Sequence, residues 1–331
     1  MSVPFIGRLA DLWIGRETTR GVGVSPNYAL PKTALSHDLK TITVPSSMGY
    51  GVIGEGNQAM VAQRWAQGTI EGDLLVKPFG LILAAVFGAA PSSSGVADSA
   101  YTHTFTLLNA NNHASLTVVR SDEIDSQMFE FAMLQRLDLT IVPEDVVKFT
   151  AEFISREPID SVDPAAAPQN QNYIADNKWL GRHATVKVAS LTSGLAAASA
   201  LSLKSFTLSF VKNLKNNFVL GTLGPEDIVN QKFEITGELE LDYNDQTYRN
   251  LVKNNTYQAM RINLNNADAL IGVTSTPQFT LDLSRVYFEA WEPNFALDEV
   301  VTQKFTFRAL FDITNDNIVN SCTLINAIVS Y

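Results

Sequence analysis

The sequence has almost no cysteine. Cys322 is the one cysteine among 331 residues, which excludes a disulfide within the chain and any cysteine-rich zinc site. A single cysteine of this kind is expected to be a small packed side chain. Nothing in the cysteine pattern therefore indicates a disulfide-stabilised secreted scaffold.

The sequence also lacks an excess of basic residues. Lys and Arg number 24 against 34 Asp and Glu, which gives a formal net charge of -10 and a pI near 4.9. Surfaces that bind nucleic acid phosphates are usually basic, so stable binding of DNA is not expected. The hydrophobic content of 46% is sufficient for one large folded domain or two ordinary ones.

Long hydrophobic runs are missing as well. The longest, "LLVKPFGLILAAVFGAA" from Leu74 to Ala90, contains Lys77 and Pro78 and is too short to span a bilayer. The first 21 residues lack the basic start and apolar core of a signal peptide. We therefore expect a soluble protein that is synthesised in the cytoplasm and has no membrane partner.

Motifs for catalysis or metal binding are absent. His37, His103, His113 and His183 show no metal-ligand spacing, and no serine nucleophile elbow or phosphate-binding loop occurs. "GYGVIG" from Gly49 to Gly54 spells a dinucleotide-binding pattern, but a strand follows it rather than a helix. We interpret it as a hairpin tip and predict no enzyme activity, cofactor or metal.

The sequence does contain a short repeated motif, Val-x-Gln-(Lys/Arg)-aromatic, with a fourth, shortened copy. The copies consist of Val61, Gln63, Arg64 and Trp65; Val147, Lys148 and Phe149; Val229, Gln231, Lys232 and Phe233; and Val301, Gln303, Lys304 and Phe305. Flanking segments match in the same order: "LKTITV" (39–44) with "LKSFTL" (203–208), and "LDLTIV" (137–142) with "LDLSRV" (281–286). This order predicts a duplicated domain with two hairpins in each half.

Each repeat alternates in polarity. In "FEITGELELDY", apolar side chains from Phe233 to Tyr243 alternate with acidic or hydroxyl side chains, which is typical of a strand with one dry and one wet face. We expect Trp65, at the aromatic position of its motif, to pack in a core or an interface. Two helices are predicted, one ending near Gly88 and one capped by Asn244 or Asp245.

These patterns predict a mainly β protein with four segments. Residues 1–38 are expected to form an extended N-terminal arm, and residues 39–160 a first β domain. Residues 161–175, within a stretch rich in Pro, Ala, Asn and Gln, are expected to be a linker before a second β domain at 176–331.

Three stretches, "GRETTRGVGVSPNYALP", "GEGNQAMVAQRWAQGTIEGDL" and "LLVKPFGLILAAVFGA", resemble the major tail tube proteins of long-tailed (siphovirus-type) bacteriophages. The resemblance implies β-sandwiches with a flanking helix, whose hairpins build a closed inter-subunit β-barrel in stacked rings. Two such domains per chain imply a trimeric, pseudo-hexameric ring of about 24 barrel strands. A hexamer in which one half of each chain lines the channel is the alternative.

The resemblance also implies a virion protein whose channel serves genome ejection. Carboxylates lining the channel would repel the DNA backbone, so that DNA passes without specific binding. The candidate lumen-facing acids are Asp138, Glu152, Glu234, Glu238, Glu240 and Asp282. Lys148, Lys232 and Lys304 are expected to pair with acids of adjacent strands or rings. Loops and residues 15–32 are expected to stack the rings.

Expected partners are further copies of the chain and other tail proteins (tape measure, terminator and baseplate). Two alternatives remain open at this level. Another phage ring component, such as a tail terminator or baseplate hub, would share the fold. A carbohydrate-binding β-sandwich module would also be acidic and rich in Asn and aromatic residues, but it gives no reason for matched hairpins.

Overall fold

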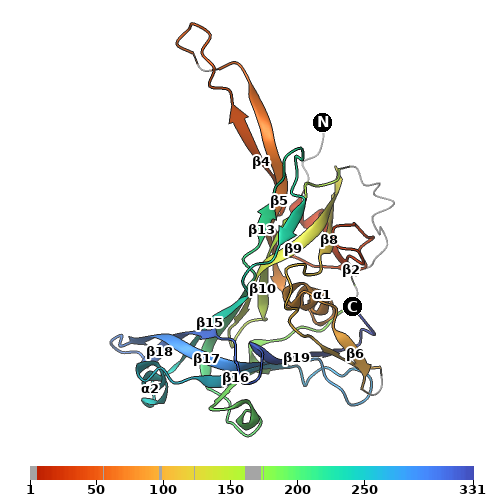
Figure 1. The fold of residues 1–331 in the computed structure, drawn as a ribbon. Coiled ribbons are helices and arrows are strands. Elements are labelled where there is room, and N and C mark those ends of the chain that lie inside the picture. The colour runs from red at the N-terminus through yellow and green to blue at the C-terminus, as the bar shows by residue number, and fades with distance from the viewer. Residues whose placement is uncertain (1–5, 55, 97–98, 123, 161–172, 174) are drawn as a thin grey trace.

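A computed structural model describes residues 6–54, 56–96, 99–122, 124–160, 173 and 175–331. These residues form a large antiparallel β-sheet assembly with two α-helices (Figure 1). The predicted mainly β class is confirmed. Within the described part of the chain, no helix is long and apolar enough to cross a membrane.

Eight long strands pair side by side in one antiparallel sheet, here called the eight-strand sheet. In spatial order these are β4 (Asp38–Pro45), β5 (Ala59–Asp73), β10 (Lys148–Ser155), β9 (Ser126–Ile141), β12 (Leu203–Val211), β15 (Glu234–Asp242), β18 (Thr302–Ala309) and β17 (Gln278–Asn294). A short strand, β3 (Ala34–Leu35), precedes β4 and pairs with β5 in the same register. The sheet thus joins strands from both halves of the sequence.

The predicted alternation of polarity is confirmed in these strands. In β15, Ile235, Leu239 and Leu241 are buried, whereas the intervening acids are partly exposed. Leu239 lies opposite the buried Phe305 of β18. Because neighbouring strands keep their apolar side chains in register, the sheet has one apolar face and one polar face.

Further strands form a second layer, into which β9 and β17 both extend. The beginning of β9 pairs with β8 (Leu116–Ser121), followed by β1 (Asp11–Arg16) and β2 (Tyr28–Ala29). The beginning of β17 lies between β16 (Gln258–Asn265) and β19 (Val319–Asn326), with β11 (Ala184–Ala189), β7 (Tyr101–Thr104) and β6 (Ser92–Gly95) beyond them. The short elements are η1 (Gly7–Leu9), η2 (Gly181–His183), η3 (Thr192–Gly194), β13 (Lys215–Asn217) and β14 (Asp227–Val229).

Both helices lie on the apolar side of the eight-strand sheet (Figure 1). Helix α1 (Val76–Phe87) is almost wholly buried, and the Phe87 ring is 6.3 Å from that of Phe210 in β12. It ends, as predicted, at Gly88, whose φ of 80° is readily adopted by glycine. Helix α2 (Thr247–Lys253) begins after Gln246, one residue later than predicted, although the Asp245 carboxylate still accepts the Thr247 N–H bond.

The N-terminal region differs from the expected extended arm. Leu12 and Ile14 of β1 are fully buried, and β1 lies between β2 and β8. Leu12 and Ile14 of the segment "DLWIGR" belong to the main hydrophobic core. The sequence did not predict this packing, because the flanking residues show little periodicity. Most of the expected linker, 161–175, lies outside the described residues.

A long hairpin projects from the body instead. We call residues 39–63 the β4–β5 arm; it comprises most of β4, the turn at 46–58 and the start of β5 (Figure 1, orange ribbon). All eight residues of β4 are exposed. The "GYGVIG" segment lies in the exposed turn, so its interpretation as a hairpin tip is confirmed.

Candidate channel-lining surface and strand edges

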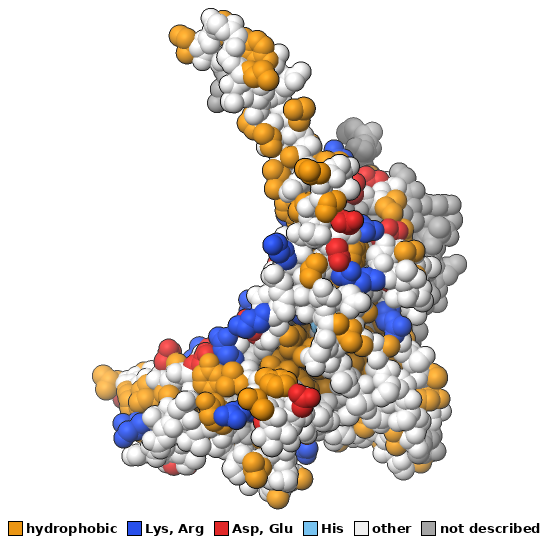
Figure 2. Space-filling view, in the orientation of Figure 1, with side chains coloured by type: hydrophobic (Ala, Val, Ile, Leu, Met, Phe, Trp, Pro, Cys, Tyr) orange, Lys and Arg blue, Asp and Glu red, His pale blue; other side chains and the backbone are white. Residues whose placement is uncertain are grey.

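The polar face of the eight-strand sheet is the hollowed side of the molecule. The helices pack on the opposite, apolar face, and the sheet curves so that its polar face is concave (Figure 1). Figure 2 shows Lys and Arg side chains interspersed with Asp and Glu along this hollow. The hollow side is therefore a charged surface built by alternate residues of adjacent strands.

Five of the six candidate acids lie on this polar face. Asp138 accepts a bond from Arg136 Nε at 2.9 Å within β9, and Glu152 of β10 accepts one from Gln67 Nε2 at 2.9 Å. Glu240 of β15 accepts a longer bond from Ser205 Oγ at 3.3 Å. These acids are held in place by neighbours while remaining partly exposed.

Glu234 and Glu238 form ion pairs on the same face. Glu234 pairs with Lys232 at 2.9 Å and with Arg308 of β18 at 2.8 Å. The bond from Lys232 is the main reason that the pKa of Glu234 lies below its usual value. Glu238 pairs across the β15–β18 ladder with Lys304 at 2.7 Å, and this bond raises the pKa of Lys304.

Asp282 does not belong to this surface, and its prediction as a lumen residue is wrong. It is 4% exposed and receives two bonds of 2.7 Å from the Arg261 guanidinium. It lies in the part of β17 that pairs with β16 and β19. A carboxylate enclosed within the second layer cannot face a channel.

Sequence reasoning missed other charged residues of the polar face. The missed acids are Asp38, Glu71, Asp73, Asp242, Glu289 and Glu292, and the bases on this face are Lys40, Arg136, Lys148, Lys204, Lys232, Lys304 and Arg308. Their register places them beside the predicted acids, and the same alternation could have identified them. Among the described residues, the acids on this face outnumber the bases.

The three lysines of the motif pair with acids in different ways. Lys304 pairs across adjacent strands, as predicted. Lys232 pairs with Glu234 two residues away, and Lys148 with Asp145 in the preceding turn. Within the chain, the last two lysines therefore have local acids as partners, and their pairing with acids of adjacent rings stays a prediction.

The four motif aromatics do not share one environment. Phe149 and Phe305 are buried, and Phe233 packs near Phe87 and Phe210 on the apolar side. Trp65 lies on the polar side, on the same face as Gln67, with its ring edge against Phe218 at 6.0 Å. A shift of one residue between β5 and β15 places the two side chains on opposite faces.

One of the flanking sequence matches does not align equivalent strands. Leu137, in "LDLTIV", lies between β10 and β12, whereas Leu281, in "LDLSRV", lies between β16 and β19. The residue of β17 opposite Phe305 is Trp291, just as Leu139 of β9 lies opposite Phe149. Strand β17 continues past the matched segment to Asn294.

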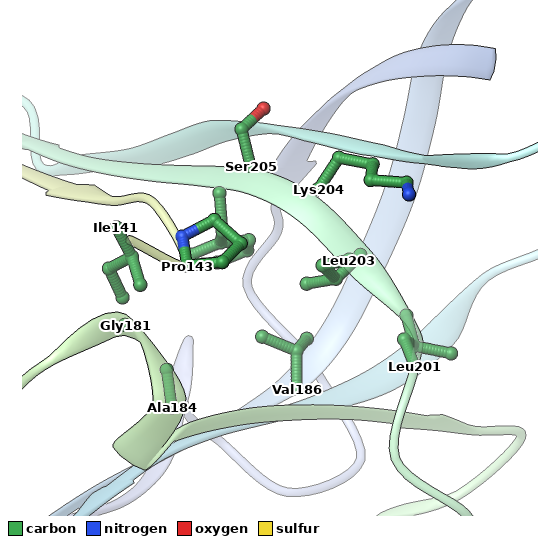
Figure 3. Close-up of a pocket in the computed structure, with 10 residues that line it drawn as sticks. Ile141, Pro143, Gly181, Ala184, Val186, Leu201, Leu203, Lys204 and Ser205 are labelled. Carbon is green, nitrogen blue, oxygen red and sulfur yellow. The ribbon is translucent and has the colours of Figure 1, made fainter. Parts of the chain in front are cut away.

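The pocket in Figure 3 offers no catalytic arrangement. Ile141, Val186 and Leu203 line it, and the Ser205 hydroxyl points away toward Glu240. Within the described residues, no group of three or more His, Cys, Asp or Glu side chains is placed to hold a metal ion. Each histidine has its own local partner: His37 with Ser155, His103 with Ser93, His113 with the Leu108 carbonyl and His183 with Asp268.

The eight-strand sheet ends in two open edges. Within the described chain, β3 and β4 pair with β5 alone, and residues 287–294 of β17 pair with β18 alone. Open edges present unpaired backbone groups and commonly receive another strand. In the middle of the sheet, by contrast, the corresponding part of β9 is covered by β12.

Comparison with known proteins identifies the family of the chain. The family described as phage tail tube protein matches residues 7–309. A solved structure titled "Crystal structure of Hcp protein" is 12% identical, covers 42% of this chain and 96% of its own, and superposes with a TM-score of 0.24. No curated protein matches the chain. The family match spans most of the sequence, and the chain therefore belongs to the phage tail tube protein family as a structural, non-enzymatic component of the virion tail.

Proposed function

We propose that three copies of the chain close into a ring in which their eight-strand sheets form one β-barrel of about 24 strands. The observation that carries this proposal is the single sheet order running from β4 to β17, with four strands from each half of the sequence. Its two open edges would meet between neighbouring copies. Closure would remove both edges, which isolated sheets must otherwise protect.

The two halves act in this proposal as tandem tube-like domains. The pairing of β9 with β12 supports this view, because six residue pairs join the halves in one continuous ladder. A hexameric ring with one half outside the channel would require this ladder to be broken. The three-copy ring keeps it intact.

The polar face is proposed to line the channel. Its acids outnumber its bases, so the face would repel the phosphates of DNA while the interspersed lysines and arginines limit repulsion among the carboxylates. Glu238 with Lys304 and Glu234 with Arg308 are such pairs. DNA would pass as a transient occupant without specific contacts.

Stacking of rings is assigned to the β4–β5 arm. Residues 15–32, the earlier candidate, pack largely on their own chain: Leu30 is 2% exposed and Glu17 is 3% exposed. The arm instead exposes apolar side chains at its end, including Met48, Val52 and Ile53 at 70%, 70% and 108%. An apolar tip held away from its own body is suited to pack on a second copy.

Electron microscopy of the purified chain, concentrated and left to stand, tests the assembly. We expect hollow tubes built of rings with threefold or pseudo-sixfold symmetry. Single rings that never stack would favour a terminator or hub. Particles that stay monomeric, even with purified tail initiation complexes added, would contradict the proposal.

Charge reversal tests the channel. Replacing Glu152, Glu238 and Glu240 by Lys should slow DNA ejection from assembled virions while tubes still form, because the channel would then attract phosphates. The same residues changed to Gln should give a smaller delay. Asp268→Lys is the matched control, since Asp268 follows β16, outside the eight-strand sheet, and is 59% exposed in its side chain. Equal ejection rates in all variants would oppose this lining.

A further inference from the structure

We infer that residues 33–38 of one copy pair antiparallel with residues 287–293 of the next copy, with Ser36 directly opposite Ala290. The inference rests on the proposed closed ring and specifies how its subunits join. The occupant of each open edge is thus a second copy of the same chain, and the register of the joint is defined residue by residue.

The pattern for the joint lies within the chain, where β9 and β12 connect the two halves. There Leu208 lies opposite Leu139, Ser209 opposite Asp138 and Phe210 opposite Leu137. Leu208, Phe210 and both leucines are buried, so this ladder seals the apolar side. If the halves are equivalent, the ladder between chains should follow the same geometry.

Shared partners identify the part of β17 that corresponds to β9. Lys148 and Phe149 of β10 match Lys304 and Phe305 of β18 in sequence, and both phenylalanines are buried. Phe149 lies opposite Leu139, and Phe305 lies opposite Trp291. Trp291 therefore takes the place of Leu139, and Ala290, opposite Thr306, takes the place of Asp138, which lies opposite Thr150.

The same reasoning identifies the counterpart of β12 at the other edge. Phe149 faces Gly72 of β5, and Phe305 faces Leu239 of β15, whose other neighbour is Phe206. Two residues along, Ile70 corresponds to Gly237: Ile70 is opposite Leu35, and Gly237 is opposite Leu208. Leu35 thus takes the place of Leu208, and by continuation Ser36 takes that of Ser209 and His37 that of Phe210.

This structural equivalence differs from the match of "LKTITV" with "LKSFTL". The register with β5 aligns β12 with residues 33–38 and leaves 39–45 for the projecting arm. Leu35 packs against the core and His37 is 1% exposed, which agrees with the buried positions of β12. Ser36 and Asp38 are exposed, as expected on the polar side.

The chemistry of the two edges agrees with the register. Leu35 would lie opposite Trp291, and His37 opposite Phe288, on the apolar side. Ser36 would lie opposite Ala290, and Asp38 opposite Tyr287, on the polar side. Trp291 is half-buried in the single chain, and the joint would cover its remaining exposed surface. No charges of equal sign come directly opposite one another.

Disulfide crosslinking tests the joint. Residues directly opposite in a ladder have Cβ atoms about 4.5–5.5 Å apart, within or near disulfide range. The double variant Ser36→Cys/Ala290→Cys, assembled under reducing conditions and then oxidised, should give covalent dimers and trimers in denaturing, non-reducing gels. The native Cys322 is fully buried and should not contribute.

Three further double variants test whether the crosslink reports the proposed register. Asp138→Cys/Ser209→Cys, the in-chain counterpart, should form an intramolecular bond before assembly. Ala34→Cys/Glu292→Cys is a second joint pair and should also yield trimers, whereas Ser36→Cys/Glu292→Cys, shifted by two residues, should crosslink much less. The second pair guards against a local effect of one substitution.

The outcomes distinguish an error in the proposed register of the joint from an error in the proposed three-copy ring. Assembled rings in which the in-chain pair crosslinks but neither joint pair does, or in which the shifted pair crosslinks best, would overturn the register and leave the ring standing. Dimers from Ser36→Cys alone would instead indicate that residues 33–38 of two copies meet each other. A ladder reaching six chains would contradict the three-copy ring itself, and so would wild-type protein that never forms rings.

Discussion

The β4–β5 arm and the connection between β12 and β15 link corresponding pairs of strands but behave in opposite ways. The arm leaves the body, and residues 49–54 of its turn are exposed (Figure 1). The connection, residues 212–233, folds back over the polar face, where β13 and β14 pair with each other. Equivalent topology therefore does not determine where a hairpin connection goes.

Side chains within the connection explain why it folds back. Ile228 is fully buried in a cluster with Phe131, Met133 and Ile154. Arg20, from the N-terminal region, donates to the Asp227 carboxylate at 2.5 Å and to the Ile228 carbonyl at 2.6 Å. The arm has comparable apolar residues, but its glycine-rich turn makes no such contacts with the body within the described residues. Its apolar side chains therefore stay exposed in the single chain.

The most direct test of this comparison replaces one isoleucine by alanine in the connection and one in the arm. Ile228→Ala should lower the free energy of unfolding of the single chain by about 2–5 kcal/mol, because it leaves a cavity in a closed cluster. Ile53→Ala should change it by less than about 0.5 kcal/mol, since that side chain is 108% exposed. Urea unfolding measures both, and equal losses would contradict the distinction.

During assembly we expect the opposite order of effects, with a larger effect from Ile53→Ala than from Ile228→Ala. Ile53→Ala should slow tube growth, scored by light scattering and microscopy, if the arm tip packs on a second ring. Chains carrying Ile228→Ala that remain folded should polymerise more nearly like wild type. Normal growth of the Ile53 variant would remove the arm tip from the stacking contact.

Lys212, at the start of the folded connection, gives a pH-dependent test. It is 1% exposed, and its ammonium donates to the Ala85 carbonyl at 2.7 Å near the end of α1. Burial, with a smaller contribution from Arg20, lowers the pKa of Lys212 from 10.5 to about 7. Between these values the unfolded chain binds more protons than the folded chain, so stability should rise with pH.

Comparison with Lys212→Met isolates this effect from other titrating groups. From pH 7 to 9.5, the wild type should gain up to about 3 kcal/mol of unfolding free energy relative to the variant. Urea unfolding at both pH values measures the difference. Parallel pH profiles for the two proteins would show that Lys212 titrates normally.

The smallest expected effect concerns the link between Arg20 and the connection. Arg20 also donates to the His113 carbonyl at 3.0 Å and lies 4.5 Å from the centre of the Phe131 ring. Arg20→Ala should cost about 1–3 kcal/mol, because several partly buried acceptors lose their donor. Limited proteolysis should then cleave within 212–233 faster than in wild type.

Arg182→Ala is the control for this change. Arg182 pairs with Asp268 at 2.7 Å, but both side chains are more than half exposed, so its loss should cost less than about 1 kcal/mol. A similar loss of stability in both variants, without faster cleavage of the connection, would indicate that Arg20 does not hold it in place.

Periodicity predicted much of the sheet and most of its polar face. Alternation in "FEITGELELDY" placed Glu234, Glu238 and Glu240 correctly, and Gly88 marked the end of α1. It failed for Asp282, because the part of β17 that holds this residue pairs within the second layer. Trp65, which was expected to pack in a core or an interface, packs against the cluster of Phe131, Met133, Ile154 and Ile228.

The sequence by itself determined the β class, the two helices and the acidic charge, because these depend on local periodicity and composition. Only the tertiary structure decided which strands are equivalent, which edges remain open, and that one connection folds back while the other projects. Those features depend on pairing between residues far apart in the chain, such as β9 with β12 and Arg20 with Asp227. Local sequence patterns do not encode the register of such contacts.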